Sequence, residues 1–326
     1  MKATENPNIP ARKGSPATRW LLVILALFLI VTPSFHPAVA QSATGSLVYL
    51  AGSENSALNR RMLSLLEEAM GSTTIIRSFS RGQTSQDSTT PVIALGPEAF
   101  TRVRQENKSV PILALLVDES FIDGYAERSE GSVSGILYNP PLLRQAIAGK
   151  VILPQATRVA MLARPDTVEI YESVTEELPD YGLEGKVFIV TSDDRLIPTL
   201  IRALNYGDFI LAAPDNNIYN PRTIKHILLT AYRRNRIVIG PSQAYVKAGS
   251  LASTYTPLTQ IANLAADFVA EYRANGQLPS PAYPDNFSID LNSQVARSMN
   301  IPLQDRQDII RSVMEQLTGP EEAADE

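Results

Sequence analysis

Short apolar runs alternate with amphipathic stretches along most of the chain. The run SLVYLA at 46–51 is typical of a strand. The stretch at 54–71 repeats apolar residues at helical spacing and ends at Gly71, which predicts a helix. The same alternation predicts strands at 73–79, 91–96, 110–118, 134–139, 158–165, 185–191, 208–214, 236–240, 250–256 and 287–292. It predicts helices at 97–107, 166–182, 192–207 with a break near Pro198, 221–235, 257–276, 293–300 and 304–319. Polar segments at 81–90 and 119–133 are expected to be loops.

Alternating strands and helices predict an α/β fold, because parallel sheets need helices on both faces. The strands are continuous apolar runs, as strands covered on both sides should be. The chain of 326 residues is long for one doubly wound sheet, so we expect two doubly wound parallel-sheet lobes joined by a hinge. The expected first lobe is 41–134 plus 250–280, and the second is 135–249 plus 281–301. Residues 302–326 are expected to form a C-terminal helix and an acidic disordered tail.

The N-terminal segment has the pattern of a secretory signal peptide. Basic residues precede a short apolar run at 20–31, and Ala38-Val39-Ala40 resembles a cleavage site. We expect cleavage between Ala40 and Gln41 and a periplasmic location. The alternative is an uncleaved anchor, although twelve apolar residues are fewer than the ~20 that span a bilayer.

Composition restricts the chemistry of the exported chain. Removing residues 1–40 leaves 25 basic and 33 acidic side chains, a net charge of −8, which does not favour nucleic acid. The chain has no cysteine, and its exported part keeps one histidine, His226, which we expect on the surface of a helix. We therefore expect no metal site, no cofactor and no enzymatic activity.

The segment ILAAPDNNIYNP at 210–221 places an acid and two amides, Asp215, Asn216 and Asn217, where a buried strand ends. Ligands of open parallel sheets bind beyond the carboxyl ends of the strands. Asn220-Pro221 is typical of an N-cap followed by Pro at the first helical position, so we expect the next helix to begin there, with N–H groups that favour an anion. A carboxylate beside a helix N-terminus suits a zwitterion such as an amino acid. The alternative is a turn and cap only, because Asp and Asn are common at such junctions.

Two longer segments carry a resemblance to a known family. They are DNNIYNPRTIKHILLTAYRRNRIVIGPSQAYVKAGSLASTY at 215–255 and YPDNFSIDLNSQVARSMNI at 283–301. They resemble the ABC-transporter substrate-binding protein family that includes the bacterial tryptophan-binding receptor. The similarity extends over about 90–301 and is densest from 207 onward. It implies a type I periplasmic binding protein fold, with two α/β lobes, three hinge crossings and a ligand in the cleft.

The resemblance also implies site residues. The family's Asp-Asn pair falls on Asp215 and Asn216. Its hinge pattern falls on Gly240, Ser242, Tyr245, Val246 and Gly249, which places Tyr245 on the second crossing.

The chain departs from the family's pattern at two places in the first lobe. The family's Gly-Thr-Pro turn falls on Gly96-Pro97-Glu98, where the hydroxyl residue is missing and an acid appears. The family's helix between the second and third strands is replaced by a short polar segment, so the first lobe is expected to be reduced. Both departures fall near the expected cleft.

The remaining ligand candidates each have a structural alternative. Ser53 and Asn55 follow the first strand and face the expected cleft, or cap the first helix. Pro97 and Glu98 stand in the first turn of a helix, where an acid is favoured in any case. Tyr138 at the first crossing stacks on a ligand ring or packs the hinge. Asp193 and Asp194 open a helix and are interpreted as caps.

Three functions compete. The first is an exported solute-binding protein that captures a small molecule, an amino acid or related zwitterion, for an ABC importer. The second is a ligand-sensing module for a membrane signalling partner. The third, a hydrolytic enzyme, is disfavoured by the single histidine. We expect a monomer with a small-molecule ligand and an ABC permease or membrane sensor as partner.

Overall fold

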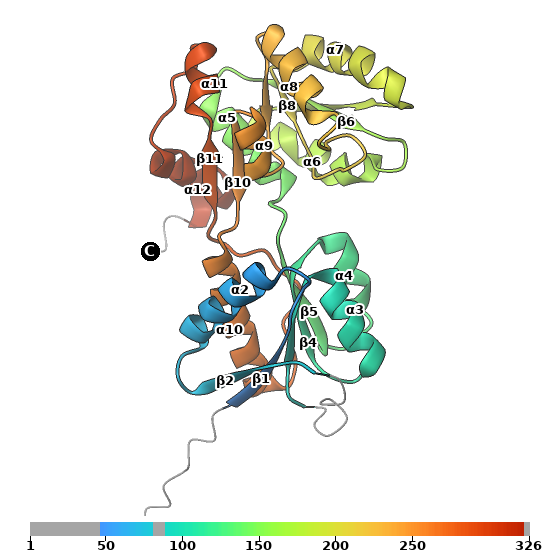
Figure 1. Cartoon of the computed structure of the whole chain (residues 1–326). Coiled ribbons are helices and arrows are strands. Elements are labelled where there is room, and N and C mark those ends of the chain that lie inside the picture. Colours follow the sequence, from blue (N-terminus) through green and yellow to red (C-terminus); the bar gives the residue numbers. More distant parts are fainter. Residues whose placement is uncertain (1–45, 81–88, 323–326) are drawn as a thin grey trace, which may run out of the picture. The chain divides into compact units, whose positions relative to one another are not determined.

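The computed structural model describes residues 46–80 and 89–322 (Figure 1). The expected signal peptide at 1–40, the polar segment at 81–88 and the tail residues 323–326 lie outside the described residues. Among the described helices, none is long and apolar enough to cross a membrane. The described strands form two separate sheets.

The first sheet is parallel throughout, in the order β2-β1-β3-β4-β5. Its strands are β1 (Ser46–Ala51), β2 (Thr74–Ser78), β3 (Val92–Leu95), β4 (Ile112–Val117) and β5 (Val133–Leu137). Its helices are α2 (Ser56–Met70), α3 (Gly96–Glu106), α4 (Glu119–Ala126) and α10 (Leu258–Asn275). Successive residues of β1 point to opposite faces, as a strand requires. Val48 packs with α2 and α10, whereas Tyr49 packs with the α3 and α4 side.

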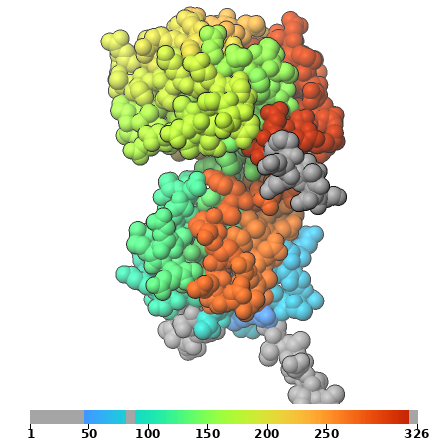
Figure 2. All heavy atoms as spheres, turned by 180° about the vertical axis from the view of Figure 1, so that it is seen from behind, coloured from blue at the N-terminus to red at the C-terminus, as the bar shows by residue number. Residues whose placement is uncertain are grey.

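Helix α10 belongs to the first sheet although it lies far along the sequence. Ile261, Ala265 and Val269 of this helix are buried in the same cluster as Leu66 of α2. Figure 2 shows this late segment, coloured orange, beside blue and teal residues from the first third of the chain. The first sheet is therefore completed by residues that come after most of the second sheet.

The second sheet has the order β11-β10-β9-β8-β6-β7 and is parallel except for the pair β10 and β11. Its strands are β6 (Arg158–Ala163), β7 (Glu184–Ile189), β8 (Phe209–Leu211), β9 (Ile237–Ile239), β10 (Ala252–Tyr255) and β11 (Ser288–Leu291). Its helices are α5 (Leu142–Ile152), η2 (Val168–Tyr171), α6 (Glu172–Glu177), η3 (Leu178–Tyr181), η4 (Asp193–Arg195), α7 (Leu196–Tyr206), α8 (Ile224–Arg233), α9 (Gln243–Ala248), α11 (Ser293–Ser298) and α12 (Arg306–Glu322).

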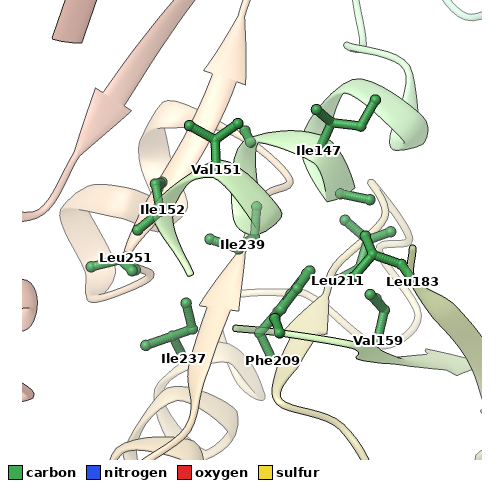
Figure 3. Packing of buried hydrophobic residues seen from close by; sticks show 14 of the residues in the cluster. Ile147, Val151, Ile152, Val159, Leu183, Phe209, Leu211, Ile237, Ile239 and Leu251 are labelled. Atoms are coloured by element: carbon green, nitrogen blue, oxygen red, sulfur yellow. The ribbon is translucent and has the colours of Figure 1, made fainter. Parts of the chain in front are cut away.

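Helix α5 lies close to the second sheet, and a glycine allows the approach. A Cβ on Gly149 would lie 2.8 Å from the Phe209 ring and 3.2 Å from Ile239. Figure 3 shows Val151 and Ile152 of this helix in the same cluster as those strand residues. The opposite face of the sheet is covered by α7 and α8. The expected α/β fold with two helix-covered parallel sheets is confirmed.

The pairing of the strands corrects the expected division of the chain into two lobes at two places. Strand β5 pairs with β4 in the first sheet, although 135–249 was assigned to the second lobe. Strand β10 pairs with β9 in the second sheet, although 250–280 was assigned to the first. Strand pairing is a long-range choice, and a short apolar run has the same local pattern in either sheet.

Four predicted elements also need correction. Residues 119–126 form α4 where a loop was expected, because Phe121 and Ile122 of this helix pack against the first sheet. Pro198 does not break a helix, since it stands in the first turn of α7, where no N–H partner is lost. The expected helix at 166–182 is three short pieces. Residues 320–322 of the expected tail continue α12.

Candidate functional site

Three loops meet at the carboxyl edge of the second sheet. Strand β6 lies between β7 and β8, so the segments that follow these strands are neighbours. Arg164 follows β6, Asp193 follows β7 and Asp215 follows β8. Polar groups from three separate parts of the sequence therefore gather at one edge, where ligands of parallel sheets bind.

Asp215 is the buried acid of this edge. Its residue exposure is 4%, and both carboxylate oxygens accept hydrogen bonds. One oxygen accepts from the Thr167 hydroxyl at 2.8 Å, and the other accepts from the Asn217 backbone N–H at 2.8 Å. The Asp215 carbonyl also accepts from the Tyr219 N–H at 2.7 Å, which closes one helical turn. Asp215 thus caps a turn, as the alternative prediction held, and each carboxylate oxygen keeps a second lone pair.

Thr167 connects Asp215 to Arg164. The Thr167 hydroxyl accepts the Arg164 backbone N–H at 3.1 Å while it donates to Asp215. The Arg164 guanidinium pairs with Asp193 and points a second nitrogen at the Val190 carbonyl, 3.5 Å away. Asp193 was interpreted as a helix cap. That interpretation is wrong, because the short helix η4 shows no side-chain cap bond and Asp193 binds Arg164 instead.

Three tyrosines surround the buried carboxylate. Burial raises the pKa of Tyr171, Tyr219 and Tyr245, and the Asp215 charge raises each of them further. The Tyr171 hydroxyl accepts the Ala213 N–H at 3.1 Å, and the Tyr245 hydroxyl donates to the Tyr219 carbonyl. The Tyr219 and Tyr245 rings meet edge to face, with centroids 6.5 Å apart. All three side chains remain neutral donors or acceptors at neutral pH.

The expected second crossing at Tyr245 is not a crossing. Residues 240–249 contain α9, which connects β9 to β10 within one sheet. The described chain passes between the sheets later, after β10, and again between α10 and β11. Ser242 stands at the N-cap of α9 and makes no side-chain cap bond. The segment 240–249 has glycines at both ends and an aromatic residue, which is a composition typical of a hinge. Only the pairing of the strands shows that it connects two strands of one sheet.

The helix after Asp215 begins later than expected. Helix α8 starts at Ile224 with Thr223 as its N-cap, three residues beyond Pro221. The Asn220 side chain instead accepts from the N–H groups of Arg222 and Thr223, at 3.0 and 3.3 Å, and caps a turn. Asn216 is exposed. The predicted helix N-terminus beside Asp215 is replaced by two successive capped turns.

The candidates of the first sheet lie just before α2, in the first turn of α3 and just after β5. Asn55 caps α2, since its side chain accepts the N–H groups of Ala57 and Leu58, both at 3.1 Å. The Ser53 hydroxyl donates to Asn59 at 2.9 Å. Pro97 and Glu98 stand in the first turn of α3, as expected. Tyr138 is 43% exposed. Their contact with a ligand stays a prediction.

A cavity of about 570 Å³ lies near the start of α5. None of the nine predicted ligand residues lines it. Its walls come from the segments after β4, β5 and β8, from helices α4, α5, η2, α6 and α12, and from the segment before β11. Its lining residues are Asp118, Glu119, Ser120, Asn139, Pro140, Pro141, Leu142, Leu143, Arg144, Glu169, Ile170, Ser173, Val174, Glu177, Pro214, Tyr283 and Leu317.

Thr167 and Arg164 were not among the site residues predicted from the sequence. Arg164 stands near the end of the strand predicted at 158–165 and Thr167 follows it, so the rule that selected Asp215 also points to this segment. Histidine 226 is exposed on α8, in agreement with the prediction. Within the described ranges, no group of three or more His, Asp or Glu side chains is placed to hold a metal ion.

No protein-family model matches the chain, and no curated protein matches it. Solved structures do match. A ligand-free, open substrate binding protein with adhesive properties from Clostridium difficile has a TM-score of 0.64 at 14% identity, over 80% of this chain and 96% of that one. An ABC domain in complex with L-Trp from Streptococcus pneumonia has a TM-score of 0.54 at 14% identity, over 82% and 97%.

A conserved domain protein from Vibrio cholerae has a TM-score of 0.51 at 15% identity, over 82% of this chain and 97% of that chain. Identities this low show the fold and no more. The chain has the type I periplasmic binding protein fold.

Proposed function

We propose that this chain is an exported solute-binding protein that captures a small molecule, an amino acid or related zwitterion, for an ABC importer. The observation that carries the proposal is the buried Asp215 carboxylate at the carboxyl edge of the second sheet. Its oxygens hold one hydrogen bond each, and the surrounding tyrosines are neutral. A carboxylate in this setting receives an ammonium group by a charge-assisted hydrogen bond.

Two similar structures support a ligand-binding role. One belongs to a substrate binding protein, and another was solved in complex with L-Trp. In this proposal the chain acts in the periplasm as a monomer without enzymatic activity. Domain closure around a ligand is the usual response of proteins with this fold.

Native mass spectrometry of the protein purified from its own cells tests the proposal. We expect a bound small molecule with an ammonium group to be released on unfolding, and the mature chain to begin at Gln41. Protein that carries no small molecule, and that binds none of the twenty amino acids by calorimetry, would contradict the proposed function.

A further inference from the structure

Arg144 on α5 is a buried cation with unused hydrogen-bond donors. The residue is 8% exposed, and its Nε and Nη1 atoms have no hydrogen-bond partner among the described residues. The guanidinium carbon lies 4.6 Å from the centroid of the Phe287 ring. Burial lowers the pKa of Arg144, and the nearby Asp285 charge opposes this. A buried guanidinium without hydrogen bonds is costly, so its donors are suited to an incoming acceptor.

Arg144 lines the cavity of about 570 Å³ described above. Small-molecule sites have volumes of roughly 300–1,000 Å³. Apolar side chains from α5, η2 and α6 supply part of the wall; they are Leu142, Leu143, Ile170 and Val174. Val174 is fully buried, so this part of the wall is a packed surface. The cavity thus combines one buried cation with an apolar wall.

The other charges of the cavity are acidic and exposed; they are Asp118, Glu119, Glu169 and Glu177. Asp118 accepts a hydrogen bond from the Asn139 side chain, and Glu119 accepts one from the Tyr283 hydroxyl at 3.4 Å. These carboxylates repel a multiply charged anion and attract an ammonium group. A buried cation and an acidic rim together favour a ligand with both charges.

We propose that this cavity binds the carboxylate of a zwitterionic solute and that Arg144 is the anchor. The guanidinium donates to the carboxylate, an apolar side chain of the solute lies against Ile170, and the exposed acidic rim attracts the ammonium group as the solute enters. The inference rests on the proposed function and names its solute class, amino acids with apolar side chains. It adds an anchor that is separate from Asp215.

Calorimetry and ¹⁵N NMR of the arginine Nε–H groups test the anchor on the full mature chain. The probes are L-phenylalanine, L-leucine, phenethylamine, which lacks the carboxylate, and 3-phenylpropionate, which lacks the ammonium group. We expect at least one amino acid to shift the Arg144 Nε–H signal, and both partial probes to bind more weakly. Arg144→Met should weaken amino-acid binding about tenfold or more, the effect of a lost charged hydrogen bond. Arg144→Lys should keep part of the affinity.

The outcomes separate this inference from the proposed function. If an amino acid binds Arg144→Met as tightly as the parent chain and only Asp215→Asn weakens it, the anchor is wrong and the proposed function stands. An unchanged Nε–H signal at saturation with an amino acid overturns the anchor even where Arg144→Met fails to fold. If neither amino acid binds the parent chain, the proposed solute class is wrong, and the molecule released in native mass spectrometry decides the function.

Discussion

The Thr167 hydroxyl donates a hydrogen bond of 2.8 Å to the Asp215 carboxylate, and this bond joins the loop after β6 to the loop after β8. The same hydroxyl accepts the Arg164 N–H. One side chain therefore fixes both the buried acid and the segment that carries the neighbouring guanidinium. The geometry of the candidate site depends on residues 48 positions apart in sequence.

Thr167→Val tests this connection. Valine has nearly the same shape and removes both hydrogen bonds, so one carboxylate oxygen of Asp215 loses its hydrogen-bond donor. We expect a loss of about 1–2 kcal/mol in the free energy of unfolding, measured by urea denaturation with an unchanged m-value. Thr167→Ser keeps the hydroxyl and is the matched control. A valine variant as stable as the parent would show that water replaces the hydroxyl.

Asp215→Asn tests the proposed ammonium contact. The amide keeps the shape, and its oxygen still accepts the Asn217 N–H, so we expect the fold to survive. Loss of one partner of a buried charged hydrogen bond costs about 2–5 kcal/mol, so affinity for the bound solute should fall about 30-fold or more. Calorimetry measures the change.

Asp194→Asn is the comparison for that variant, because Asp194 is exposed and bonds Ser192 within its own turn. It should leave affinity unchanged. Equal affinities of parent and Asp215→Asn for the identified solute would mean that Asp215 only caps its turn.

Asn55→Ala separates capping from ligand contact in the first sheet. Asn55 accepts two N–H groups of α2, and loss of an N-cap costs about 1 kcal/mol. We expect lower stability in thermal or urea unfolding and unchanged affinity, whereas Asn55→Ser should restore stability. A fall in affinity without a fall in stability would support the contact predicted from sequence.

Gly240→Ala should destabilise the second sheet strongly. Gly240 has φ +82°, and a Cβ there would lie 2.7 Å from the Ala212 carbonyl oxygen. Backbone strain of this kind alone costs about 1–3 kcal/mol, and the contact with backbone adds to it. Gly71→Ala is the control, because its φ is +68° but nothing lies within 4 Å of the added Cβ. Equal losses of stability in the two variants would show that backbone strain, and not the contact with Ala212, causes the destabilisation.

Asp208 should make stability depend on pH. Its carboxylate accepts the N–H groups of Thr157 and Arg158 at 2.9 and 3.0 Å. Burial opposes ionisation, but these bonds outweigh it and hold the pKa of Asp208 below its usual value. A lowered folded-state pKa stabilises the fold above the unfolded value of about 3.9, and this contribution is lost as pH falls through the folded pKa.

Asp208→Asn should therefore be less stable than the parent at neutral pH, and the difference should shrink in acid. Urea unfolding at a series of pH values measures it. A difference that is constant from neutral pH into acid would assign the loss to packing and not to the charge.

Local sequence patterns determined most of the elements. Strand β1 matches its predicted residues 46–51, and α2 ends before Gly71 because that glycine adopts φ +68°. These features depend on neighbours in sequence, such as alternation, helical spacing and a terminating glycine. The α/β fold follows from their order along the chain. The position of Asp215 at a strand end was also predicted, since a strand end is a local feature.

Only the tertiary structure decided which strands pair and what each polar group binds. Strand β5 belongs to the first sheet and β10 to the second, the reverse of what was expected. Helix α9 connects two strands of the same sheet. Thr167 meets Asp215 because β6 pairs with β8. Arg144 lines a cavity whose walls also include Pro214, Tyr283 and Leu317, which lie far from it in sequence. Strand pairing and burial depend on contacts between residues that are distant in sequence, and a local sequence pattern does not predict such contacts.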